Sequence, residues 1–233
     1  MSEPTLDEAI VIPDISELVT EDDTPADNFQ SEKQQRLLVE PLYSAWSPGI
    51  PFIAAANVGL FYALKQDPLV PDMLLSLEVE MSSDWSQKQN RSYFVWQFGK
   101  VPEVAIEIVS NKIGKELTSK KKTYACIGIP YYVVFDPLEQ LQGQDEMNRS
   151  LLRVWALSEG QYMELPQPWL ELVGLGLTLW EGAFEQQQGT WLRWCNRSGV
   201  VIPTGKERAA QQQERADRLA ERLRQMGIDP DEI

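Results

Sequence analysis

Apolar and polar residues alternate most clearly over residues 101–110, where the sequence reads VPEVAIEIVS. Successive side chains of a strand point to opposite faces, so this alternation predicts a strand with two distinct faces. One face carries Val104, Ile106 and Ile108, and the other carries Glu103, Ala105, Glu107 and Val109. Glu107 therefore lies in an apolar setting, between two isoleucines.

A helix and a second strand are predicted directly after this segment. Over residues 116–127, Leu117, Tyr124 and Ile127 fall on one side, which indicates a helix that ends at Gly128. Residues 130–136, PYYVVFD, are almost all apolar and predict a strand buried on both faces.

Shorter apolar segments before and after this unit predict further strands. They are expected within residues 51–64, 70–77, 151–157, 161–164 and 174–179, with a hairpin or flap over 93–98 and a tryptophan-rich β elaboration over 180–194. The order of strands around a single helix indicates an α/β domain with a mixed sheet flanked by helices.

The last predicted element is a helix over residues 204–226. Thr204 and Glu207 form a capping-box pattern at its start. Ala216, Leu219 and Leu223 belong to one apolar stripe. The stripe is consistent with docking on the parent domain or with a two-stranded coiled coil between subunits. We expect a homodimer, with this helix as the candidate interface.

The chain divides into three parts. Residues 1–33 are acidic and lack periodicity, so we expect a mostly disordered arm. Residues 34–200 form the folded domain, and residues 201–233 carry the C-terminal helix. No run of 18 apolar residues occurs, and the N-terminus lacks a signal-peptide pattern, so we expect a cytoplasmic protein without a membrane partner.

Composition narrows the chemistry that the chain can perform. Histidine is absent, which excludes catalytic triads and metal sites built on imidazole. The two cysteines show no zinc-ligand spacing. The net charge of −14 argues against broad affinity for nucleic acid, although a local basic patch occurs over residues 112–122.

Three features carry the candidate chemistry. Glu107 is a carboxylate inside an apolar strand, which is costly unless it is paired or bound to a metal. Asp72 follows Pro71 at the start of another predicted strand, and Lys120, Lys121 and Lys122 lie on the next helix. If the two strands are adjacent, the carboxylates converge, and such oxygen ligands suit Mg²⁺ or Mn²⁺.

These motifs together resemble the PD-(D/E)XK nuclease superfamily, and more narrowly its restriction-endonuclease-like family formerly catalogued as a domain of unknown function. The resemblance rests on Pro71-Asp72, Glu107-Ile108-Val109-Ser110, Lys120, Tyr124, Gly128-Ile129-Pro130-Tyr131-Tyr132 and Asp136-Pro137. It implies a restriction-endonuclease-like fold and a Mg²⁺-dependent endonuclease acting on DNA.

The resemblance also implies residue roles. Asp72 and Glu107 take the two acidic positions, with the Ile108 carbonyl as a further metal ligand. The superfamily lysine is replaced by Val109, and Lys120 takes its place from the helix, with Lys121 or Lys122 as alternatives. Glu40 loosely matches an acid that the first helix often contributes.

Three other interpretations remain open at the level of sequence. Glu107 and a lysine are also compatible with a purely structural ion pair. The acidic charge and the missing lysine at position 109 are compatible with a nuclease fold kept as a binding or assembly module. Nothing in the sequence excludes RNA as the substrate.

Overall fold

The computed structural model describes residues 28–112, 115–226 and 229. Its helices are α1 (Phe29–Ala45), η1 (Lys88–Asn90), α2 (Val95–Phe98), η2 (Glu116–Lys120), α3 (Lys121–Ile127) and α4 (Gly205–Gln225). Its strands are β1 (Phe52–Ala55), β2 (Leu60–Phe61), β3 (Met73–Leu77), β4 (Tyr93–Phe94), β5 (Val104–Ile108), β6 (Tyr131–Phe135), β7 (Leu152–Ser158), β8 (Gln161–Glu164), β9 (Trp169–Leu170), β10 (Leu175–Phe184) and β11 (Gln187–Cys195).

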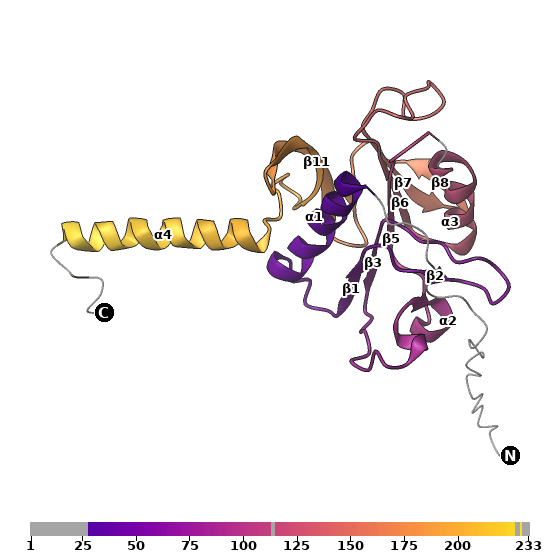
Figure 1. Ribbon diagram of the computed structural model, residues 1–233, viewed down its shortest axis with the longest axis horizontal. Helices are drawn as coiled ribbons and strands as arrows, with labels where there is room; N and C mark the ends of the chain where they lie inside the picture. The colour runs from indigo at the N-terminus through magenta and orange to yellow at the C-terminus, as the bar shows by residue number, and fades with distance from the viewer. Residues whose placement is uncertain (1–27, 113–114, 227–228, 230–233) are drawn as a thin grey trace, which may run out of the picture.

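A six-stranded mixed sheet in the order β1-β3-β5-β6-β7-β8 is the centre of the fold (Figure 1). Strands β5 and β6 are parallel and are joined through η2 and α3, whereas the other neighbours pair antiparallel. The predicted α/β fold with a mixed sheet is therefore confirmed. β10 and β11 form the predicted β elaboration, as a long hairpin that β9 extends into a second sheet.

The beginning of the folded domain differs slightly from the sequence prediction. Acidic composition places the end of the arm at residue 33, but α1 begins at Phe29, and Ser31 is buried. The Asn28 side chain accepts hydrogen bonds from the N–H groups of Gln30 and Ser31, which caps the helix. Most of the predicted arm, residues 1–27, lies outside the described residues.

The prediction of a hairpin or flap over residues 93–98 is wrong. Tyr93 and Phe94 form β4, which pairs parallel to β2, and the next four residues form α2. Gly99 ends that helix in the left-handed conformation, at φ 73°. Both residues of β4 are buried. The burial of their aromatic rings therefore determines the conformation of this segment, and the alternation of aromatic and other residues along it does not.

Helix α4 extends away from the body of the domain (Figure 1). Its predicted capping box is present, because Thr204 and Glu207 exchange side-chain to backbone hydrogen bonds. No residue of α4 is buried, and the helix contacts the domain only near its start. Docking of its apolar stripe on the parent domain is therefore ruled out.

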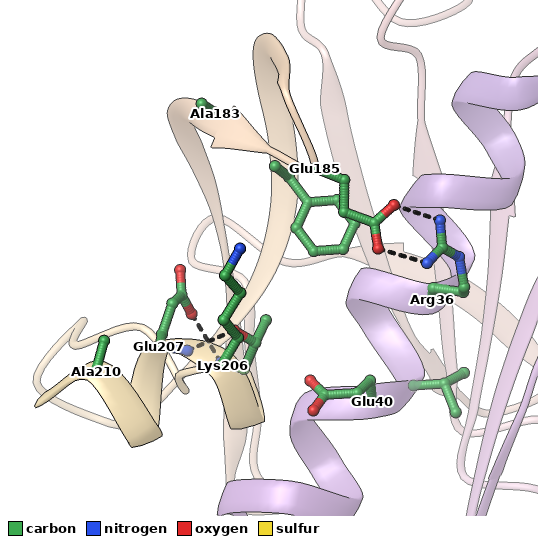
Figure 2. Close-up of a pocket in the computed structure, with 10 residues that line it drawn as sticks. Arg36, Glu40, Ala183, Glu185, Lys206, Glu207 and Ala210 are labelled. Atoms are coloured by element: carbon green, nitrogen blue, oxygen red, sulfur yellow. Dashed lines mark hydrogen bonds and ion pairs between the residues drawn. The ribbon is translucent and has the colours of Figure 1, made fainter. Parts of the chain in front are cut away.

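The start of α4 lies beside α1 and the tip of the β10–β11 hairpin. The Gly205 N–H donates to the Glu40 carboxylate at 2.8 Å. A cavity of about 550 Å³ separates these elements, and Arg36 pairs with Glu185 along its wall (Figure 2).

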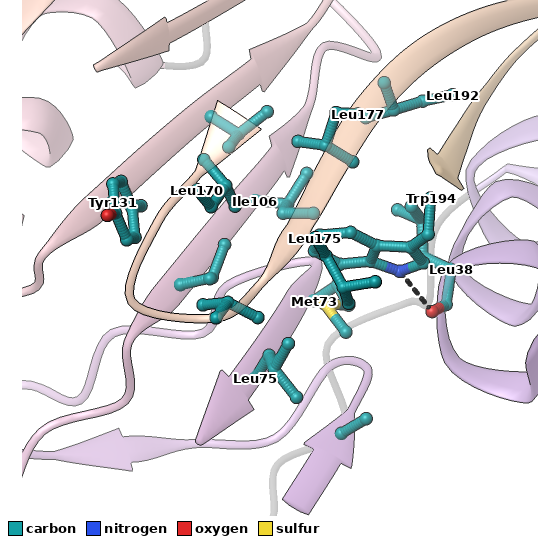
Figure 3. Packing of buried hydrophobic residues seen from close by; sticks show 14 of the residues in the cluster. Leu38, Met73, Leu75, Ile106, Tyr131, Leu170, Leu175, Leu177, Leu192 and Trp194 are labelled. Atoms are coloured by element: carbon teal, nitrogen blue, oxygen red, sulfur yellow. Dashed lines mark hydrogen bonds between the residues drawn. The ribbon is translucent and has the colours of Figure 1, made fainter. Parts of the chain in front are cut away.

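The main core lies on the face of the central sheet that α1 and the β9–β11 sheet cover. Trp194 of β11 is fully buried there, and its indole N–H donates to the Leu38 carbonyl of α1 at 2.8 Å (Figure 3). The second core lies on the opposite face, where α3 covers Ala105 and Val109. Glu107 lies on this second face by strand alternation.

Replacing Trp194 tests whether the β10–β11 hairpin is part of the domain core. We expect Trp194→Ala to lower the free energy of unfolding by about 3–5 kcal/mol, because it leaves a cavity between α1 and the sheets. Chemical denaturation measures the change. Trp85→Ala is the control, since Trp85 is 63% exposed, and we expect it to change stability by less than about 0.5 kcal/mol. Equal effects of the two variants would contradict a shared core.

Candidate active site

The candidate site lies where β3 begins and β5 ends. Met73 pairs with Ile106 in the antiparallel ladder, so Asp72 comes next to the end of β5. The Ile108 N–H donates to Asp72 Oδ2 at 2.6 Å. Asp72 and Glu107 thus extend from neighbouring strands on the same face of the sheet. The structure brings these two predicted acids together.

Helix α1 holds the other oxygen of Asp72. Gln35 donates from Nε2 to Asp72 Oδ1 at 2.9 Å, and the Asn57 side-chain amide donates to Gln35 Oε1 at 3.0 Å. Gln35 is only 4% exposed. The sequence does not reveal this contact, because a glutamine in a helix is usually exposed and carries no pattern of its own.

Glu107 is 1% exposed, and both of its oxygens accept hydrogen bonds. Lys120 Nζ donates to Oε2 and the Tyr124 hydroxyl donates to Oε1, each at 2.8 Å. Burial raises the pKa of Glu107 above its usual range, and the charge and hydrogen bonds of these two partners offset part of that rise. Burial, together with Glu107, also raises the pKa of Tyr124, so its hydroxyl stays protonated as a donor.

The lysine is positioned by a π-helical turn. In η2 the Lys120 N–H donates to the Lys115 carbonyl at 3.1 Å, five residues back. π-turns inside helices are frequent at functional sites. Here Lys120 and Tyr124, four residues apart, both face Glu107. Gly128 ends α3 at φ 89°, as the sequence predicts.

The three consecutive lysines have different surroundings. Lys121 lies 3.8 Å above the centre of the Trp155 ring, and Lys122 is exposed. Lys120 alone among them contacts Glu107. Burial lowers the pKa of Lys120, but Glu107, Glu116 and Asp72 outweigh that effect and hold it above its usual range.

Glu116 is a further acid that the sequence analysis missed. It is 6% exposed, and its Oε1 lies 3.8 Å from Lys120 Nζ. Its spacing of four residues from Lys120 is the sequence signal that could have found it. Its Oε2 is buried and has no hydrogen-bond partner among the described residues.

The oxygen atoms of the site fit a hydrated divalent cation. In a strand, the N–H and C=O of one residue point to the same edge, so the Ile108 carbonyl faces the side on which its N–H meets Asp72. Within the described residues, no group of three or more acidic, cysteine or histidine side chains could hold a metal. Two carboxylates and one carbonyl match Mg²⁺, which keeps several of its waters.

Two other residues named by the sequence analysis lie outside this chemistry. Val109 is 1% exposed and packs in the second core, so that position provides no ammonium group. Glu40 accepts the Gly205 N–H and lines the cavity beside α4, so its match to an acid of the site is wrong.

A mixed sheet that brings two acids and a lysine together at adjacent strand ends defines a protein of the restriction-endonuclease-like class. The chain belongs to the Uma2 family, described as "Putative restriction endonuclease", whose sequence model matches residues 18–173. The predicted family is thereby confirmed.

One solved structure also resembles part of this chain. A crystal structure of "a putative nuclease belonging to DUF820 from Anabaena variabilis ATCC 29413" is similar at 15% identity and a TM-score of 0.38, over 62% of this chain and 72% of that chain. No curated protein matches the chain. Among the described helices, none is long and apolar enough to cross a membrane.

Removing Lys120 should make stability depend more strongly on pH. In Lys120→Met, the pKa of buried Glu107 rises further because its counter-charge is lost. When the pKa of a carboxyl is higher in the folded state than in the unfolded state, the protein loses stability as pH rises from the unfolded pKa to the folded one. We expect the free energy of unfolding to fall by about 2 kcal/mol at pH 8 and by less at pH 5. Breaking a fully buried ion pair costs about 3–5 kcal/mol, and the loss here is smaller because Lys120 is partly exposed.

Chemical denaturation of wild type and variant at both pH values measures this difference. The control is Lys120→Met combined with Glu107→Gln, which removes the titrating group and should lose the added pH dependence. If Lys120→Met lost the same stability at both pH values, Lys120 would not compensate the charge of Glu107.

Proposed function

We propose that the protein is a Mg²⁺-dependent endonuclease that hydrolyses phosphodiester bonds of DNA. The observation that carries this proposal is the buried Glu107 carboxylate, paired with Lys120 and joined to Asp72 through the Ile108 N–H. Membership of the Uma2 family supports a nuclease. A structural ion pair between Glu107 and Lys120 does not account for a second acid, Asp72, held beside it by Gln35.

Each residue has a role in this proposal. Asp72, Glu107 and the Ile108 carbonyl would hold the metal, which would supply a Lewis acid for the phosphate and an attacking water of lowered pKa. Lys120 would orient that water and stabilise the negative charge that develops on the phosphate oxygens. The water oxygen bonds to phosphorus and gives its proton to solvent, and the ester P–O bond breaks as the leaving oxygen takes a proton from solvent. Tyr124 holds the Glu107 carboxylate in place.

Cleavage of supercoiled plasmid and single-stranded DNA in Mg²⁺ or Mn²⁺ tests this function. We expect metal-dependent cleavage by wild type and a rate loss of about 10²–10³-fold or more in Glu107→Gln and in Lys120→Ala. Lys121→Ala is the matched control and should keep most of the activity, because Lys121 contacts Trp155 instead of Glu107.

Calorimetric titration with Mn²⁺ separates the metal ligand from the lysine. Glu107→Gln should lose Mn²⁺ binding while Lys120→Ala keeps it. Unchanged Mn²⁺ affinity in Glu107→Gln would remove Glu107 from the metal site. A folded wild type that binds no metal and cleaves neither DNA nor RNA would instead support a binding module without turnover, and cleavage of RNA alone would change the substrate.

We also propose that the protein is a homodimer, with α4 pairing with its copy in a second subunit. Ala209, Ala216 and Leu223 recur every seven residues, and Leu219 and Met226 lie three positions after the last two of them. These positions form one stripe, on which Leu219 is 54% exposed and Met226 is 67% exposed. A matching helix from a second copy would bury this stripe.

Replacing Leu219 tests the interface. Because a lysine in the stripe would have to be buried in a dimer, we expect Leu219→Lys to shift the protein from dimer to monomer. Light scattering over a range of protein concentrations measures the mass. Gln211→Lys, which adds the same charge outside the stripe, should stay dimeric. A monomeric wild type would refute the proposal.

A further inference from the structure

Positive charge is concentrated in one short part of this acidic chain. Of its ten lysines, five lie at positions 112, 115, 120, 121 and 122, although the chain as a whole has a net charge of −14. The stretch from Lys112 to Lys122 contains a single acid, Glu116. Because Glu116 is buried against Lys120, the exposed charge of this stretch is positive.

The structure separates these lysines into two groups. Lys120 is paired with Glu107, and Lys121 lies over the Trp155 ring. Lys112, Lys115 and Lys122 are exposed, and none of them forms an ion pair within the described part of the chain. The two engaged lysines are adjacent in the chain, with exposed lysines on either side of them.

Cations elsewhere in the domain are mostly neutralised. Ion pairs with acidic side chains engage Lys33, Arg36, Lys100, Arg153, Arg193 and Arg197. The lysines around η2 therefore differ from the general surface. Their charge remains available beside the candidate active site.

A groove begins on the same helical segment. It has a volume of about 520 Å³ and lies between η2–α3 and the start of β8. Thr118 of η2 lies on one side together with Lys121 and Lys122, and Gln161 and Tyr162 lie on the other. Exposed Lys122 stands at the edge of this groove, whereas Lys112, Lys115 and the residues of the candidate site do not line it.

We propose that Lys112, Lys115 and Lys122 bind the phosphate backbone of duplex DNA beside the candidate active site. The inference rests on the proposed nuclease function and adds the surface that holds the substrate. Lysine is a flexible point charge suited to phosphate, and phosphate contacts fix the position of a duplex without reading its sequence. Only three such contacts are proposed, so binding is weak, and its salt dependence reflects about 0.9 in slope for each contact.

Fluorescence anisotropy of a labelled DNA duplex, in EDTA so that no cleavage occurs, measures the contacts directly. Wild type is compared with Lys112→Gln/Lys115→Gln/Lys122→Gln between about 50 and 200 mM KCl. We expect weaker binding by the triple variant, and a slope of log Kd against log salt that is smaller by about 0.9 per lost contact, or about 3 in all. Lys65→Gln is the control, because Lys65 is exposed and lies outside the patch.

The outcomes distinguish this surface from the catalytic proposal. An unchanged slope in the triple variant, an equal change in Lys65→Gln, or tighter binding of single-stranded RNA than of duplex DNA would overturn the surface. Binding that depends on the three lysines supports it, even where wild type shows no cleavage in Mg²⁺. Cleavage by wild type together with unchanged binding by the triple variant would leave the nuclease and remove the surface. Equal thermal unfolding of variant and wild type shows that the fold is intact.

Discussion

The structure around the site depends on the burial of one carboxylate, Glu107, in the middle of the central sheet. A charge that is 1% exposed is stable only with partners that compensate for lost water. Lys120 and Tyr124 provide that compensation from η2 and α3, which fixes this helical segment against β5. Lys120 and Tyr124 thus reach back from the connection between β5 and β6 to the strand that it leaves.

A second link joins the acids of neighbouring strands. Asp72 accepts the Ile108 N–H at the point where the β3–β5 ladder ends, so a side chain takes over a backbone hydrogen bond. Gln35 holds the other Asp72 oxygen from α1. Helices on opposite sides of the sheet therefore fix two carboxylates at one place. A set of metal ligands requires such preorganisation, because misplaced oxygen atoms weaken the binding of a small cation such as Mg²⁺ more than that of a larger one.

The positions of Val109 and Lys120 explain why the positive charge beside Glu107 comes from the helix and not from the strand. Val109 lies on the same strand face as Glu107 and packs in the second core. An ammonium there would be buried without water, whereas Lys120 brings its charge from the helix and remains partly exposed. Lys112, Lys115 and Lys122 are exposed, so an overall acidic protein has a positive region beside the buried Glu107.

The sequence by itself determined the strands around Glu107, the helix that Gly128 ends, the capped C-terminal helix and the family. These follow from local periodicity and from an acid whose cost among isoleucines demands a partner. Only the tertiary structure decided that Lys120 rather than Lys121 or Lys122 meets Glu107, because a π-turn sets the register of the helix. The tertiary structure also places Gln35 and Glu116 at the site. Residues 93–98 form β4 and α2 instead of the predicted hairpin. Such contacts depend on packing between distant segments, which no local pattern encodes.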